Sequence, residues 1–283
     1  MGLPRKLVLK ALRALPWRAR RQRRFLESTV RTPALHGIPA HGPARVLVLG
    51  VYLADRPNSA AHLVERFAST PDLEVEQRWT ALGGTPPVGR LAEVTARVAS
   101  EAKPKFTLVN ELLRPDDVAG HDFIVVCDDD IHVPGNFLSA FIAYQRAFGF
   151  AVAGPARTWH SHFDHAFSLQ RPWLWARRTR FVECGPLVSF RRDAAALLLP
   201  FDEAGAMWGF DLVWPEVIGR HGLTMGIVDA LSIDHSLRVQ GASYDKEGQN
   251  AAMARYLAAT PHLSIREAFT VLKRYPIHGP LRP

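Results

Sequence analysis

The chain has 283 residues, of which 47% are hydrophobic and 22% are charged, which is enough apolar material for one large domain with appendages. It contains no uncharged apolar run long enough to span a bilayer, and its two cysteines favour a reducing compartment over a disulfide framework. The sequence also lacks a zinc-finger spacing and a Walker-type phosphate loop. Because Lys10, Arg13 and Pro16 interrupt the first apolar stretch, we expect no signal peptide and a cytoplasmic protein.

The net charge of +8 belongs to one segment. Residues 1–31 contain ten Lys or Arg and one acid, Glu27, which gives +9, so residues 32–283 together carry −1. Leucines and Trp17 are interleaved with the basic residues, and this pattern predicts an amphipathic helix over 3–26 on an anionic membrane surface. The alternative is a disordered basic tail or one that contacts nucleic acid.

The composition divides the rest of the chain into three parts. Residues 32–44 contain three prolines, two glycines and two histidines and are predicted to be a linker. We expect the folded domain at 45–240 and a helical extension at 241–283, with helices over 248–258 and 264–273.

The folded domain begins with alternating strands and helices. The pattern predicts a strand, a helix, a strand and a helix, in that order: 45–52, 59–68, 73–82 and 89–101. Either Asn58 or Ser59 is expected to cap the first of these helices. The alternation is typical of a mostly parallel, Rossmann-like sheet with flanking helices, so the predicted fold class is α/β.

Three adjacent carboxylates follow the best-formed strand of the sequence. Phe123 to Val126 is an apolar run that is typical of a strand buried on both faces. Asp128, Asp129 and Asp130 come next, and they repel one another unless a cation lies among them. Carboxylates suit Mg²⁺ or Mn²⁺, and alternate residues point the same way, so we expect Asp128 and Asp130 to bind a metal or a metal diphosphate. The alternative is a solvated acidic turn.

A helix is predicted over 105–113, just before this strand. Lys105 and Asn110 on that helix can face the phosphate or base of a nucleotide, although surface residues of these types usually have no such role.

Three histidines follow a predicted helix over 136–147 and a strand over 151–155. His160, His162 and His165 are close enough in sequence to be metal ligands. No single helix or strand presents all three on one face, so we do not expect a histidine metal site.

The last predicted elements carry the remaining candidates. A strand over 181–190 is interrupted at Gly185, and a helix then ends at Pro200. A final strand over 226–235 ends in Asp-His, where His235 can complete a metal shell.

One carboxylate is a candidate general base. Asp211 follows Gly209, which permits close approach of the backbone, and it leads into a predicted helix over 211–219. The alternative role is an aspartate that caps its own helix.

Taken together, these residues resemble nucleotide-sugar glycosyltransferases of the GT-A fold, over roughly residues 45–240. The features that carry the resemblance occur in the family's order: Lys105 with Asn110, the DxD-like Asp128-Asp129-Asp130, the segment from Gly185 through Phe190-Arg191-Arg192 to Phe201-Asp202-Glu203, Asp211, and His235. The chain is also similar to an uncharacterised family that carries a lysine-ketoglutarate-reductase trans-splicing label, which says nothing about chemistry.

The resemblance implies a donor site for a nucleotide sugar with Mn²⁺ or Mg²⁺. Asp128, Asp130 and His235 would hold the metal ion. The residues expected to bind the donor and its diphosphate are Lys105, Asn110, Asp128, Asp129 and Asp130.

The resemblance also implies an acceptor site. Asp211 would take a proton from an acceptor hydroxyl of a glycan or lipid-linked glycan, with inversion at the anomeric carbon. The residues expected to line the acceptor site are Gly185, Trp208, Gly209 and Trp214. Phe210 stands where the family usually has Glu before Asp211, and the late Asp-His lacks the familiar basic loop, so the acceptor class and the stereochemical outcome stay open.

Two other functions are compatible with the sequence. A metal-dependent phosphohydrolase would use the same carboxylates, but the downstream Ser or Thr and Lys that it needs cannot be placed. A non-catalytic adaptor would bind a membrane or nucleic acid through its basic tail.

Overall fold

The computed structural model describes Phe25, Ser28 and residues 43–101, 103–205, 208–238 and 246–278. The helix predicted at 3–26 and nearly all of the predicted linker lie outside these residues, so the membrane-surface role stays a prediction. No helix within the described ranges is long and apolar enough to cross a membrane.

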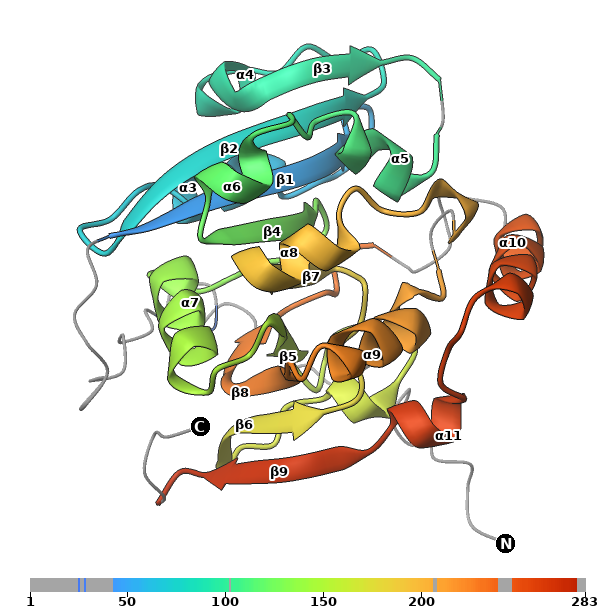
Figure 1. Cartoon of the computed structure of the whole chain (residues 1–283). Helices are drawn as coiled ribbons and strands as arrows, with labels where there is room; N and C mark the ends of the chain where they lie inside the picture. The colour runs from blue at the N-terminus through green and yellow to red at the C-terminus, as the bar shows by residue number, and fades with distance from the viewer. Residues whose placement is uncertain are drawn as a thin grey trace, which may run out of the picture.

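Nine strands form one sheet across the described part of the chain, in the order β3-β2-β1-β4-β7-β5-β8-β6-β9 (Figure 1). The strands are β1 (Ala44–Leu53), β2 (Leu73–Leu82), β3 (Thr95–Ala99), β4 (Phe123–Asp128), β5 (Val152–Arg157), β6 (Leu174–Thr179), β7 (Leu187–Arg191), β8 (Met225–Ile233) and β9 (Val271–Pro276). Pairing is parallel for β3-β2, β2-β1, β1-β4 and β5-β8, and antiparallel for the four pairs that involve β7 or β6.

Helices cover both faces of this sheet. The helices and 3-10 turns are α3 (Ala60–Arg66), α4 (Arg90–Val94), α5 (Lys105–Asn110), α6 (Asp117–Gly120), α7 (Phe137–Ala147), η1 (Ala166–Ser168), α8 (Arg192–Leu198), η2 (Glu203–Gly205), α9 (Phe210–Arg220), α10 (Lys246–Ala259) and α11 (Ile265–Ala268). Helices α3 and α7 pack on one face, and α5, α8 and α9 pack on the other. Burial of these two apolar layers is the main driving force that holds the fold together.

The α/β class with a central sheet flanked by helices is confirmed, with two corrections to its elements. The helix predicted over 89–101 ends at Val94, and the residues after it form the edge strand β3. The predicted C-terminal extension contains the helices α10 and α11, but the helix predicted over 264–273 ends at Ala268, and β9 follows it and pairs with the unpredicted strand β6. The sheet is therefore half antiparallel rather than mostly parallel.

The position of α5 is fixed by a buried ion pair beneath it. Arg78 on β2 donates to both carboxylate oxygens of Asp117, at 2.5 and 2.8 Å, and to the carbonyl of Leu112 at 3.0 Å. Arg78 and Asp117 are each about 5% exposed, so the pair is shielded from water. These contacts hold the segment after α5 against the sheet.

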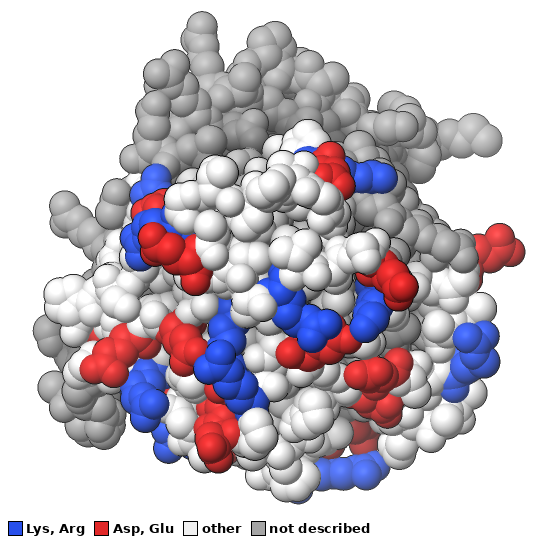
Figure 2. Space-filling model, turned by 90° about the horizontal axis from the view of Figure 1, so that it is seen from above, with Lys and Arg blue, Asp and Glu red and all other residues white. Residues whose placement is uncertain are grey.

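Charges of opposite sign alternate on the face shown in Figure 2. Surface ion pairs such as Arg90–Glu65 and Lys103–Glu111 also bring opposite charges together. A surface that binds nucleic acid gathers basic residues on one face. The face seen in Figure 2 has no such basic patch.

Candidate functional site

The carboxyl ends of four strands meet at one edge of the sheet. Strands β1, β4, β5 and β8 run in the same direction, because β4 and β5 are both antiparallel to β7. A two-way backbone bridge between His132 and Asp234 then joins the loop after β4 to the end of β8. This bridge brings the predicted Asp triplet and the predicted His235 together, although 105 residues separate Asp130 from His235. Ligands of open α/β sheets bind at such an edge.

Asp128 forms an ion pair with Lys105, with 2.5 Å between Oδ1 and Nζ. Burial alone would lower the pKa of Lys105, but the Asp128 carboxylate outweighs it and raises the pKa, so Lys105 is charged. Gly185 lies directly against this pair, since a Cβ there would be 3.2 Å from Asp128 Oδ2 and 3.4 Å from Lys105 Nζ. The structure therefore places Lys105, Asp128 and Gly185 together.

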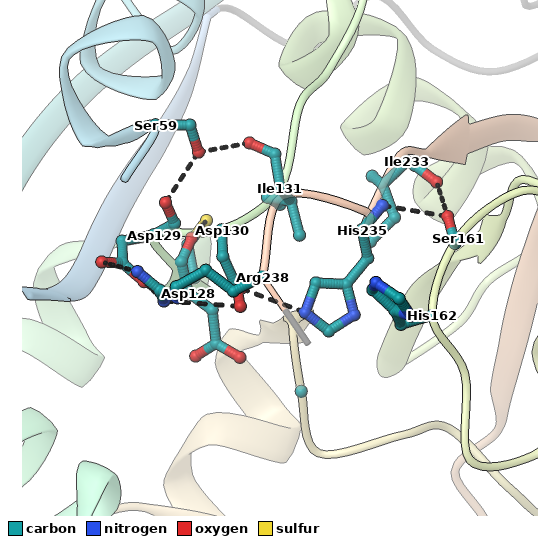
Figure 3. Close-up of polar contacts among 12 residues, drawn as sticks. Ser59, Asp128, Asp129, Asp130, Ile131, Ser161, His162, Ile233, His235 and Arg238 are labelled. Atoms are coloured by element: carbon teal, nitrogen blue, oxygen red, sulfur yellow. Dashed lines mark hydrogen bonds and ion pairs between the residues drawn. The ribbon is translucent and has the colours of Figure 1, made fainter. Parts of the chain in front are cut away.

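The Asp129 side chain points away from this edge, and its contacts stabilise the fold (Figure 3). It is 3% exposed, accepts the Leu53 backbone N–H at 2.7 Å and forms an ion pair with Arg238. Its backbone carbonyl accepts hydrogen bonds from the N–H and Oγ of Ser59, at 2.6 and 2.8 Å. The prediction that Asp129 binds the donor is therefore wrong, because its carboxylate is already used inside the protein.

Asp130 faces His235, with 3.0 Å between Oδ1 and Nε2 (Figure 3). Arg157 Nη1 lies 3.0 Å from the other ring nitrogen, Nδ1. A guanidinium can only donate, so Nδ1 accepts and the ring hydrogen lies on Nε2, facing Asp130. Burial alone would raise the pKa of Asp130, but His235 and Arg238 outweigh it and lower the pKa.

Asp128, Asp130 and His235 carry oxygen and nitrogen atoms of the kinds that divalent metal ions bind. The 3.0 Å between Asp130 Oδ1 and His235 Nε2 is a hydrogen bond in this structure, and a bound ion would replace it. Ligation by Nε2 also requires the ring hydrogen on Nδ1, so Arg157 must release that nitrogen. Among the described residues, no three or more acidic, histidine or cysteine side chains are grouped so that they could hold a metal ion together. Mg²⁺-type sites usually complete such a partial shell with water and substrate phosphates.

Asp211 lies in the first turn of α9, beside residues 183 and 184. The Cys184 thiol is 4.0 Å from Asp211 Oδ2. Burial and the negative charge of Glu183 raise the pKa of Asp211 to about 7, although backbone N–H groups at the helix start oppose the shift. A carboxylate that titrates near neutral pH suits general acid–base chemistry.

The structure contradicts the predicted acceptor role of Trp214, whereas that of Gly209 stays a prediction. Trp214 is 2% exposed and packs in the core against Phe190 and Phe210, so it cannot stack on a sugar. Gly209 has φ of +97°, which favours glycine, and its Cα lies close to α10. Trp208 is partly exposed, and its predicted role is untested by these contacts.

Asn110 is also structural, contrary to the prediction that it faces a nucleotide. Its side-chain Nδ2 donates to the carbonyl of Phe201 at 2.8 Å, and its Oδ1 accepts the Phe201 N–H at 2.8 Å. Both polar atoms of the amide are therefore committed to one loop of the fold.

Replacing Asn110 by alanine should therefore lower stability and spare ligand binding. The loss of two hydrogen bonds to partly buried backbone is expected to reduce the free energy of unfolding by about 1–3 kcal/mol. Chemical denaturation and nucleotide titration of the same variant check this. Weakened nucleotide binding with unchanged stability would restore the original prediction.

The three clustered histidines separate in the structure. His160 lies 3.4 Å from Asp234, His162 contributes its carbonyl to Arg157, and His165 packs against Phe181.

Sequence reasoning missed three charged residues of the site: Arg157, Glu183 and Arg238. Arg157 ends β5 and contacts His235, and Arg238 pairs with Asp129 and lies 3.4 Å from Asp130 Oδ2. The sequence contains a signal for Arg238. Three adjacent carboxylates require cations nearby, and Arg238 is the first basic residue after His235.

No protein-family profile and no curated protein matches this chain. Solved structures with a similar fold include GalNAc-T7 with UDP, GalNAc and Mn²⁺, at 11% identity and a TM-score of 0.48, covering 72% of this chain and 45% of that one. S. aureus TarS 1-349 in complex with UDP-GlcNAc has 8% identity and a TM-score of 0.45, covering 76% and 71%. Glucosyl-3-phosphoglycerate synthase from Mycobacterium tuberculosis, in complex with Mn²⁺, UDP and phosphoglyceric acid, has 13% identity and a TM-score of 0.48, covering 83% and 84%. At these scores, the role of each residue rests on the contacts within this chain.

Proposed function

We propose that this protein is a metal-dependent glycosyltransferase that moves a sugar from a nucleotide sugar to a hydroxyl acceptor. The observation that carries the proposal is that the Lys105–Asp128 pair and the Asp130–His235 pair lie at the same end of the sheet, with Asp211 and its pKa of about 7 nearby. Gly185 and Cys184 connect the two groups, since Gly185 touches the Asp128–Lys105 pair and Cys184 touches Asp211. Donor-side and acceptor-side chemistry therefore share one site.

The donor side supplies charge for a leaving diphosphate. Asp128, Asp130 and His235 would hold a Mn²⁺ or Mg²⁺ ion, which when bound stabilises negative charge on the departing nucleoside diphosphate. Lys105 and Arg238 add two positive side chains next to these carboxylates. Both cations balance the carboxylates before the donor binds and face the diphosphate afterwards.

The acceptor side supplies the base. Asp211 accepts the proton of an acceptor hydroxyl as that oxygen attacks the anomeric carbon, and the configuration there inverts. At pH 7 a carboxylate with a pKa of about 7 is roughly half ionised, so it can both accept and return a proton. Trp208, which is partly exposed, is the aromatic residue we assign to the acceptor.

The test is sugar transfer itself. We would incubate the protein with Mn²⁺, a panel of nucleotide sugars and a panel of glycan and lipid-linked acceptors, and look by mass spectrometry for an acceptor heavier by one sugar. UDP donors come first, because they are bound in the structures with a similar fold. The expected result is a product that forms with Mn²⁺ and disappears with EDTA.

The same assay separates the two rival functions. Phosphate release from phosphate monoesters without sugar transfer would identify a phosphohydrolase. Neither reaction, together with steeply salt-dependent binding of nucleic acid or anionic lipid through residues 1–31, would identify an adaptor. Either result overturns the proposal.

A further inference from the structure

Residues 181–184 lie against the first turn of α9. Phe181 shares a buried apolar cluster with Leu212, and Cys184 contacts Asp211 at 4.0 Å. Glu183 lies between these two contacts in the chain and is close enough to act on Asp211 electrostatically. The segment therefore brings a second carboxylate to the candidate base.

Arg157 holds that second carboxylate in place. Its Nη2 lies 2.5 Å from Glu183 Oε2 and 3.1 Å from the carbonyl of Gly185, and its Nη1 contacts the carbonyl of His162 and His235 Nδ1. Arg157 is 4% exposed, so these contacts lie inside the protein. Arginine stays protonated in proteins, so the short Arg157–Glu183 contact is an ion pair.

The other groups that face Asp211 have smaller effects. Asp164 is exposed and adds a minor negative charge, and the backbone N–H groups of Asp211 and Leu212 favour the ionised form. Burial raises the pKa of Cys184, so this neighbour stays an uncharged thiol. Burial and Glu183 are therefore the dominant causes of the raised pKa of Asp211.

We infer that Glu183 and Asp211 act as a carboxylate pair, in which Arg157 holds Glu183 by an ion pair and Asp211 is the member that exchanges a proton. Pairs of carboxylates in unequal environments divide the acid and base roles in this way. Glu183 is a positioning residue in this arrangement, because it acts through Asp211. This pairing would explain why Asp211, the base of the proposed transferase, holds a proton near neutral pH. Only the use of that proton in catalysis rests on the proposed function.

The experiment follows the Asp211 carboxyl carbon by ¹³C NMR as the pH is varied, with the signal assigned by its loss in Asp211→Asn. Glu183→Gln removes the charge and keeps the shape. We expect this variant to bind the Asp211 proton at least about tenfold more weakly than the native protein does, a shift of one pKa unit or more. The matched control, Asp164→Asn, removes an exposed charge and should change this affinity less than about threefold.

In Glu183→Gln the buried Arg157 loses its charged partner, and this variant could fail to fold, so a second variant is needed. Arg157→Gln with Glu183→Gln removes both charges, and the double variant should weaken proton binding at Asp211 in the same direction. An Asp211 proton affinity within about twofold of native in the folded variants would overturn the carboxylate pair. The titration needs no donor or acceptor, so it can support the carboxylate pair even if sugar transfer is never observed. Sugar transfer can likewise be observed even if the titration contradicts the pair.

Discussion

Replacing Asp211 by asparagine is expected to lower the rate of sugar transfer by about 10²–10⁴-fold while leaving donor binding nearly intact. Asparagine has the same shape but cannot accept the proton of the attacking hydroxyl. Asp211 does not touch Lys105, Asp128 or Asp130 through any hydrogen bond or ion pair seen in the described residues. The nucleotide affinity measured by calorimetry should therefore change less than about threefold. Full turnover in Asp211→Asn would remove the base from the mechanism.

The same residue predicts a pH dependence of activity. A base must be ionised to act, so kcat/KM should rise about tenfold per pH unit below the pKa of about 7 and level off above it. A profile that is flat between pH 5 and 8 would show that another group accepts the proton.

Asp211 should also make the folded protein less stable as the pH rises, although activity increases over the same pH range. Its pKa is raised on folding, so the folded state binds the proton more tightly and ionisation opposes folding. The cost is absent below the unfolded pKa of about 4, grows as the pH rises and is complete above about 7. At about 1.4 kcal/mol per pKa unit, it is at most on the order of 4 kcal/mol. Asp211→Asn should therefore stabilise the protein more at pH 8 than at pH 4, as measured by urea denaturation.

Replacing Asp130 by asparagine is expected to abolish the effect of metal on nucleotide binding. The amide oxygen can still accept from His235 Nε2, and Arg238 keeps its pair with Asp129, so the fold should persist. The lost charge is expected to weaken Mn²⁺-dependent nucleotide affinity by about 100-fold or more, together with transfer. The matched control is Asp72→Asn, which changes an exposed aspartate in a turn before β2. Equal affinity in Asp130→Asn and native protein would place the metal elsewhere.

Local sequence pattern was enough to predict the strands that build the site. Strands β1 and β4 are mostly apolar runs, and their burial follows directly from composition. Strand β2 instead alternates apolar and polar residues in its first half, which is typical of a strand with one exposed face. The edge strand β3 was predicted as helix because its residues are compatible with both states, and pairing with β2 decides between them. The strands β6 and β9 depend on each other across about 100 residues, so neither has a strong local signal.

The candidate site was predictable where residue chemistry alone defines it. Three adjacent aspartates require cations wherever they lie, and the predicted Lys105 and His235 are among their partners. Asn110 and Trp214 were assigned wrongly, because a polar or aromatic residue looks the same in sequence whether it faces a ligand or the core. Glu183 and Arg157 acquire their roles only when β5, β7 and α9 come together.

Thermal denaturation with Mn²⁺ and a panel of nucleoside diphosphates tests the donor site most directly. A ligand that binds only the folded state raises the melting temperature, by about 5 °C or more for a protein of this size at 100 times its Kd. We predict that one nucleoside diphosphate raises it in the presence of Mn²⁺, and that EDTA or Asp130→Asn removes the increase. An unchanged melting temperature with every nucleotide, with and without Mn²⁺, would contradict the donor site and with it the proposed transferase.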